Sequence, residues 1–236
     1  MKKLALYAGA FGLVQGLTGC TEENVSADRA GSERVLNDTQ AVPASAPQDD
    51  ERLVLAFGDS LYAGYGLDPK ESFPEQLEQA LAAKGLAVDV RNAGVSGDTT
   101  AAAQRRLAFA LDGLDRKPDL VMVNLGGNDM LRGIDPDETR RNLTAICEEL
   151  KSRDIPIMLT GMIAAPNLGN DYADRFNPIY RDLAERYDAT LYPFFLEGVI
   201  TDSGLMLADR IHPNAKGIEA ITRNVAPLVA TALKAS

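Results

Sequence analysis

From residue 53 to the C-terminus, short apolar runs alternate with longer segments whose apolar residues recur every three or four positions. The runs have the length and composition of buried strands and span residues 53–57, 87–90, 120–125, 155–160 and 190–192. The segments between them, such as the one carrying Phe73, Leu77 and Leu81, have helical spacing. Strands that alternate with amphipathic helices form a parallel sheet covered on both faces. This alternation predicts an α/β fold.

Five such units predict a flavodoxin-like, three-layer α/β/α architecture around a five-stranded parallel sheet. The sequence Asp135-Pro136-Asp137-Glu138 is typical of a helix N-terminus. We expect Asp135 to be the N-cap, Pro136 to lie in the first turn and Glu138 to complete a capping box.

The first twenty residues have the organisation of an export signal. Lys2 and Lys3 precede an apolar stretch, residues 4–17, that is too short to span a bilayer. The ending Leu17-Thr18-Gly19-Cys20 resembles that of bacterial lipoprotein signals, which implies that Cys20 becomes the lipidated N-terminus. The residue after Cys20 is Thr21 and not Asp, which under the sorting rules of the lipoproteins that the signal resembles implies a periplasm-facing lipoprotein of the outer membrane. The alternative is a plain secretory signal with an incidental cysteine.

The next segment contains nothing that could form a core. Residues 21–52 lack aromatic side chains and are rich in Ala, Ser, Pro and acidic residues, which predicts a disordered linker. We therefore divide the chain into a signal peptide (1–19), Cys20 with its linker (20–52) and a folded domain (53–236). If Cys20 is acylated, Cys147 has no disulfide partner, and its place on an apolar helical face predicts a buried, inert thiol.

Charge and residue content exclude several classes of function. The net charge is −10 and no basic patch appears, which argues against a nucleic-acid partner. The first strand is followed by neither a Gly-x-Gly-x-x-Gly nor a Walker loop. One histidine and one free thiol are a poor metal-ligand set. We therefore predict no cofactor and no metal.

Four polar segments follow strands, and ligands bind at the carboxyl ends of strands in such sheets. The segments are Gly58-Asp59-Ser60, Asn92 to Asp98, Gly126-Gly127-Asn128-Asp129, and Asp209-Arg210-Ile211-His212-Pro213. We expect all four at one edge of the sheet.

Ser60 and His212 are the candidate nucleophile and base. His212 is the only histidine in the chain, so serine chemistry has no other imidazole to use. Asp209, three residues earlier, can reach the imidazole Nδ1 and stabilise the imidazolium. The alternatives are ordinary ones: a turn with a helix cap at Gly-Asp-Ser, and a surface turn at Asp209–His212 that leads into a last helix capped by Asn214.

Three groups are candidate donors to an oxyanion. They are the Ser60 N–H, the N–H of Gly94, where a glycine permits close approach of a ligand, and the side-chain amide of Asn128. Turn glycines and an ordinary Gly-Gly-Asn loop are the competing interpretations.

Taken together, the four segments resemble the SGNH (GDSL) hydrolase superfamily, within it the bacterial thioesterase I/lysophospholipase/arylesterase group. Asn92-Ala93-Gly94-Val95-Ser96-Gly97-Asp98-Thr99 and Leu191-Tyr192-Pro193-Phe194-Phe195-Leu196 support the narrower match. The resemblance implies a serine esterase or thioesterase that works through an acyl-enzyme. Its catalytic residues would be Ser60, Asp209 and His212, and its oxyanion hole would consist of Ser60, Gly94 and Asn128.

For partners, we expect an acyl-ester or lysophospholipid-like substrate, a membrane contact through the lipid anchor, and a monomer. Residues 162–167 and 194–196, which follow strands four and five, are expected to be pocket loops. The alternatives are a carbohydrate O-deacetylase using the same machinery, and a non-catalytic envelope lipoprotein.

Overall fold

A computed structural model describes residues 51–235. They contain five strands in the spatial order β2-β1-β3-β4-β5, all parallel to their neighbours. The strands are β1 (Arg52–Gly58), β2 (Val88–Gly94), β3 (Leu120–Asn124), β4 (Ile157–Thr160) and β5 (Thr190–Tyr192). β1 and β3 are almost wholly buried, as expected for central strands covered on both faces.

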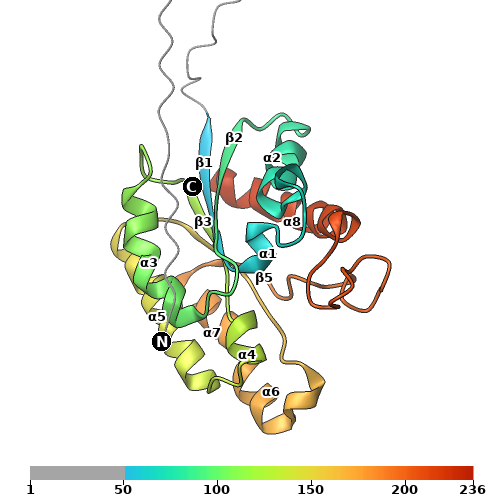
Figure 1. Ribbon diagram of the computed structural model, residues 1–236. Coiled ribbons are helices and arrows are strands. Elements are labelled where there is room, and N and C mark those ends of the chain that lie inside the picture. The colour runs from blue at the N-terminus through green and yellow to red at the C-terminus, as the bar shows by residue number, and fades with distance from the viewer. Residues whose placement is uncertain (1–50, 236) are drawn as a thin grey trace, which may run out of the picture. The chain divides into compact units, whose positions relative to one another are not determined.

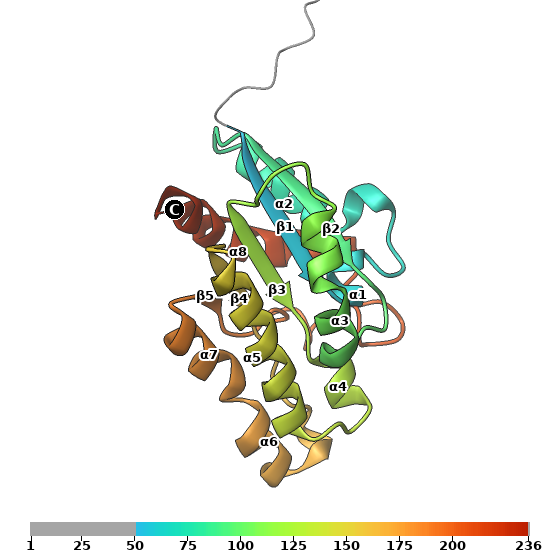
Figure 2. The same ribbon diagram turned by 90° about the vertical axis from the view of Figure 1, so that its left-hand side faces the viewer.

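Helices cover both faces of this sheet (Figure 1). Helices α2 (Phe73–Ala82) and α8 (Ala215–Ala235) pack together on one face. Helices α3 (Thr100–Asp112), α5 (Pro136–Ser152) and α7 (Ile179–Tyr187) cover the other face, the one toward the viewer in Figure 2. Three short helices lie in loops: α1 (Ser60–Ala63), α4 (Gly127–Leu131) and α6 (Asn170–Phe176). Two single 3₁₀ turns complete the set, Pro69–Glu71 and Pro166–Leu168.

The predicted fold class is confirmed, and the element bounds differ from the sequence prediction mainly at β2. This strand was expected over residues 87–90, but its ladder with β1 continues until Gly94 pairs with Gly58. Asn92 and Gly94 therefore belong to the strand, and the loop begins only at Val95. Polar composition suggested a loop, but backbone pairing with the buried central strand overrode it.

The start of α5 differs in one detail. Asp135 is the N-cap, as predicted, but its side chain accepts from the Asp137 N–H and not through a capping box with Glu138. Asn214 caps α8, as the alternative interpretation of the Asp209–His212 turn expected, since its side-chain oxygen accepts from the Gly217 N–H at 3.1 Å.

Cys147 on α5 is a free thiol and is fully buried, as predicted. Burial raises its pKa to about 12, which makes it unreactive at neutral pH. The predicted signal peptide, Cys20 and linker lie outside the described residues, apart from the last two linker positions. Among residues 51–235, no helix is long and apolar enough to cross a membrane.

Candidate active site

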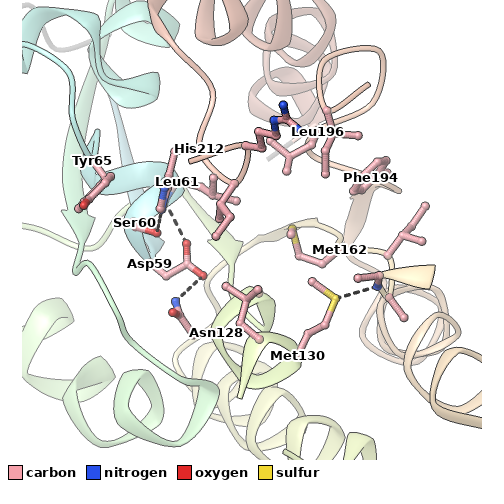
Figure 3. Close-up of a pocket in the computed structure, with 18 of the residues that line it drawn as sticks. Asp59, Ser60, Leu61, Tyr65, Asn128, Met130, Met162, Phe194, Leu196 and His212 are labelled. Atoms are coloured by element: carbon pink, nitrogen blue, oxygen red, sulfur yellow. Dashed lines mark hydrogen bonds between the residues drawn. The ribbon is translucent and has the colours of Figure 1, made fainter. Parts of the chain in front are cut away.

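A cavity of about 720 Å³ opens at the carboxyl edge of the sheet. It collects residues from the loops after all five strands, Ser96 and Gly97 among them, but Gly94 does not line it. Figure 3 shows Ser60, His212 and Tyr65 toward one end of this cavity and Met162, Phe194 and Leu196 toward the other. The lining is mostly apolar: polar groups gather around Ser60, and methionine, isoleucine, leucine and phenylalanine side chains form the remainder.

Ser60 stands at the point where β1 turns into α1. Asp59 is the N-cap of this short helix, and its Oδ1 accepts from the Leu61 N–H at 3.0 Å. Gly58 makes the turn possible, because a Cβ there would lie 2.9 Å from the Asn124 carbonyl oxygen and from the Tyr62 ring. Ser60 is the first residue of the helix, so its N–H has no intrahelical acceptor.

The structure brings the three predicted catalytic residues into one hydrogen-bonded chain. Ser60 Oγ lies 2.8 Å from His212 Nε2, and His212 Nδ1 lies 2.7 Å from Asp209 Oδ2. The other Asp209 oxygen accepts from the N–H groups of Ile211 and His212. Desolvation raises the pKa of Asp209, but these hydrogen bonds outweigh it and lower the pKa to about 2. The carboxylate is therefore ionised throughout the pH range in which an imidazole can act as a base.

The backbone around His212 is held on both sides. Leu207 N–H donates to the His212 carbonyl at 2.8 Å, and Met206 forms an antiparallel bridge with Pro213. The Tyr65 ring lies 4.4 Å from the imidazole, centroid to centroid, at an angle of 32°. The imidazole is therefore confined between a fixed loop, a carboxylate and an aromatic ring.

Asn128 faces the same end of the cavity from the first turn of α4. Its Nδ2 donates to Asp59 Oδ2 at 3.3 Å, which leaves its second amide hydrogen for a ligand. Asp59 thus makes hydrogen bonds both to the turn that carries Ser60 and to Asn128. Burial raises the pKa of the Asp59 carboxyl to about 7, against the lowering effect of its two hydrogen bonds.

Gly94 is the predicted site residue that the structure does not bring to the cavity. Its N–H donates to the Asn92 side-chain oxygen at 2.9 Å. A Cβ at Gly94 would lie 2.3 Å from the Ala63 N atom, so this glycine serves the close packing of β2 against α1. The expectation that Gly94 is an oxyanion donor is corrected accordingly.

Gly97 occupies the place expected of Gly94. It lines the cavity together with Ser60 and Asn128. Its φ of +87° is that of the third residue of a type II turn, closed by the Asp98 N–H on the Val95 carbonyl at 3.1 Å. Within residues 51–235 the Gly97 N–H has no hydrogen-bond acceptor. The sequence Ser96-Gly97-Asp98 is typical of a turn with a glycine. Because β2 was expected to end at residue 90 and in fact ends at Gly94, the turn lies later in the chain than predicted.

The two predicted pocket loops do line the cavity. Residues 162–166 form one wall, and Phe194 and Leu196 contribute to another. Phe195 between them points into the core, where it packs edge-on against Tyr62 and Phe73. Tyr65 and Met130 also line the cavity. Neither was predicted, because neither belongs to a polar segment that follows a strand.

A family model described as GDSL-like lipase/acylhydrolase matches residues 56–220. The chain belongs to this family. Esterase TesA of Pseudomonas aeruginosa is 35% identical over 193 residues, which cover 82% of this chain and 95% of TesA. Thioesterase 1/protease 1/lysophospholipase L1 of Escherichia coli K12 is 37% identical over 161 residues, covering 68% of this chain and 75% of that protein.

A solved structure supports the same conclusion. The crystal structure of AlinE4, an SGNH-hydrolase family esterase, is 53% identical, with a TM-score of 0.67 over 79% of this chain and 98% of AlinE4. The matched part of this chain therefore has nearly the extent of a complete chain whose structure has been solved. The predicted family and the predicted function as an acyl-ester hydrolase are confirmed: this GDSL-family chain is a carboxylic ester hydrolase.

Proposed function

We propose that Ser60, His212 and Asp209 are the catalytic residues and that hydrolysis proceeds through an acyl-enzyme on Ser60. The observation that carries this proposal is the hydrogen-bonded chain from Ser60 Oγ to His212 and from His212 to Asp209, at one end of an apolar cavity. His212 Nε2 takes the Ser60 proton while Oγ attacks the ester carbonyl. The imidazolium then gives this proton to the departing alcohol as its C–O bond breaks.

Water completes the reaction in the second half. His212 removes a proton from the water as it attacks the acyl carbon, and the proton returns to Ser60 Oγ when the carboxylic acid leaves. Asp209 stays ionised throughout and stabilises the imidazolium, as the lowered pKa of its carboxyl favours. In the tetrahedral intermediates the negative oxygen accepts from the Ser60 N–H, the Gly97 N–H and the free amide hydrogen of Asn128.

The substrate we propose is an ester or thioester of a fatty acyl chain, a lysophospholipid included. The apolar part of the cavity, formed by Met130, Met162, Phe194 and Leu196, accommodates a hydrocarbon chain with favourable burial. The same wall offers few partners for a carbohydrate, so the structure favours an acyl esterase over a glycan deacetylase.

Fluorophosphonate labelling tests the catalytic assignment. A fragment of residues 45–236, which contains the predicted folded domain 53–236, should be labelled at Ser60, whereas its Ser60→Ala variant should not. His212→Ala should reduce labelling at least 10²-fold, because no other imidazole is present. Labelling that persists in Ser60→Ala would place the nucleophile elsewhere. No labelling of a folded wild-type domain would favour the non-catalytic alternative.

We also propose that the protein is a monomeric lipoprotein of the bacterial outer membrane, attached through Cys20 and facing the periplasm. The support is the sequence ending Leu17-Thr18-Gly19-Cys20. Treatment with globomycin should cause an uncleaved precursor to accumulate, and the Cys20→Ala variant should lose the lipid and the membrane association. Normal processing under globomycin would exclude the lipoprotein pathway.

A further inference from the structure

Exposed apolar side chains gather at the mouth of the cavity. Within residues 51–235, eight large hydrophobic side chains are exposed, and five of these line the cavity. We call these five the apolar rim: Tyr65, Leu131, Ile163, Ile200 and Ile211. The exposed fraction is 56% for Leu131 and lies between 41% and 52% for the other four.

The rim residues come from four separate segments. Tyr65 follows α1, Leu131 ends α4, Ile163 follows β4, and Ile200 and Ile211 lie between β5 and α8. Their convergence on one opening is therefore a property of the tertiary fold. A monomeric protein rarely exposes a large contiguous apolar patch unless that surface has a binding role.

The rim continues into the apolar wall inside the cavity. Leu131 adjoins Met130, and Ile163 adjoins Met162; the inner member of each pair is buried and the outer one is exposed. A hydrocarbon chain could thus pass from the outside to the Ser60 end without leaving apolar surroundings. A soluble substrate needs the inner wall only, whereas the exposed side chains suit an extended apolar surface outside the opening.

Charge indicates which kind of lipid surface fits. The net charge is −10, which opposes approach to an anionic bilayer. Around the rim the charges are mixed: Arg132 and Arg210 adjoin Leu131 and Ile211, and exposed Asp202 lies near Ile200. A zwitterionic headgroup, with one positive and one negative group, matches a mixed rim.

We propose that the apolar rim docks onto the surface of a zwitterionic phospholipid bilayer or micelle, with the cavity mouth facing the lipid. The role of this docking rests on the proposed function, because it would present acyl esters held in that surface to Ser60. The predicted anchor permits the orientation. About 30 residues separate Cys20 from β1, and a chain of that length spans up to roughly 100 Å when extended.

The test uses residues 45–236, so that no lipid anchor contributes, in a Ser60→Ala background that leaves the lipid intact. Co-sedimentation with phosphatidylcholine vesicles is compared for this protein, a triple variant Leu131→Ser/Ile163→Ser/Ile200→Ser, and Phe109→Ser. Phe109 is the matched control because it is 82% exposed and lies on α3 outside the cavity lining. We expect the triple variant to lower the vesicle partition coefficient at least tenfold and Phe109→Ser to leave it within twofold.

A second measurement stands even if the triple variant misfolds. The chain contains no tryptophan, so Ile163→Trp and Phe109→Trp each introduce a single fluorophore. On vesicles whose acyl chains carry bromine, we expect emission from Ile163→Trp to shift to the blue and be quenched, and emission from Phe109→Trp to stay unchanged.

The proposal is overturned if the domain does not bind phosphatidylcholine vesicles, if the triple variant binds as well as its parent, or if both tryptophans are quenched equally. These outcomes do not bear on catalysis, since fluorophosphonate labelling of Ser60 is measured without lipid. Preserved labelling with no vesicle binding would leave a soluble-substrate esterase. Vesicle binding without labelling would leave the docking surface but remove the proposed mechanism.

Discussion

Asp59 is the residue on which most of the site's geometry converges. One of its oxygens closes the first turn of α1, the other holds the Asn128 amide, and its N–H donates to the Asn124 carbonyl at 3.2 Å. It is a buried carboxyl whose pKa is raised to about 7, and carboxylates at Asp129 and Asp98 add to the rise that burial causes. Ionising this buried carboxyl therefore costs free energy, while its hydrogen bonds hold the first turn of α1 and the Asn128 amide in place.

This cost should be visible as a pH dependence of stability. A carboxyl whose pKa is higher in the folded than in the unfolded state destabilises the fold as pH rises from about 4 to about 7. A rise in the pKa of Asp59 from its ordinary value to about 7 corresponds to a loss of at most about 4 kcal/mol of stability. Asp59→Asn removes this titration but also loses an acceptor, so its effect should depend on pH. Urea denaturation should show the free energy of unfolding of the variant improving, relative to wild type, between pH 4 and pH 8. A difference that is the same at both pH values would show that Asp59 does not titrate as the structure indicates.

At the scale of elements, the turn between β2 and α3 holds Gly97, which we propose as an oxyanion donor in place of the predicted Gly94. Arg132 Nη2 donates to the Gly97 carbonyl at 2.8 Å, and Arg106 Nε binds Asp98 Oδ2 at 2.6 Å. The Arg106 guanidinium also donates to the Gly58 carbonyl and lies 4.2 Å from the Phe57 ring centroid. One arginine therefore ties this turn to the end of β1, just before the nucleophile.

Gly97→Ala should lower kcat on the order of 10²-fold, because alanine disfavours a φ of +87° and the turn must rearrange. Gly85 is the matched control: its φ is +77°, open space surrounds it and it lies outside the cavity lining. Gly85→Ala should cost about 1 kcal/mol of stability and leave kcat unchanged. Steady-state kinetics on a soluble p-nitrophenyl ester decide the matter. Equal kcat for Gly97→Ala and wild type would remove the Gly97 N–H from the oxyanion hole.

Asp129 fixes α4 to two neighbouring helices. It accepts from the N–H and hydroxyl of Thr100 at the start of α3 and from the Thr139 hydroxyl on α5. All three residues are fully buried, so a change at Asp129 leaves donors without acceptors. This network places Asn128, one residue earlier, opposite Ser60.

Asp129→Asn should therefore destabilise the domain by about 3 kcal/mol, because the amide presents a donor to groups that are themselves donors. The urea midpoint of the variant measures the loss. Asp174→Asn, at an exposed position of α6, is the control and should change the free energy of unfolding by less than about 0.5 kcal/mol. A midpoint for Asp129→Asn as high as that of the control would mean that the network contributes nothing net.

At the scale of the whole molecule, the described residues form one sheet with helices on both faces. The candidate site lies at the carboxyl ends of the strands, and Arg52, the first residue of β1, lies at the opposite end. The central strands and the helices packed on them form a single hydrophobic core, which includes Cys147. Exposure of that thiol therefore requires the core to open.

In the domain 45–236, Cys147 is the only thiol, and it should react with Ellman's reagent only through unfolding. We expect a labelling rate far below that of a free thiol. In Asp129→Asn the rate should rise by about the factor by which the lost stability raises the unfolding equilibrium constant. Cys147→Ser should show no labelling. Fast labelling of the folded wild-type domain would reveal local opening of α5 that the packing does not indicate.

The sequence by itself determined the fold class and predicted which serine, imidazole and carboxylate would lie together. Alternation of apolar runs and helical faces specifies a parallel sheet, and a chain with one histidine leaves one base for Ser60. Tertiary structure decided what depends on pairing and packing. Pairing with β1 extends β2 through Gly94, so that Gly97 and not Gly94 lines the cavity. Burial changed the titration of Asp59, which no local pattern reveals. The apolar rim likewise exists only because four distant segments meet, and each of its members alone is an ordinary exposed residue.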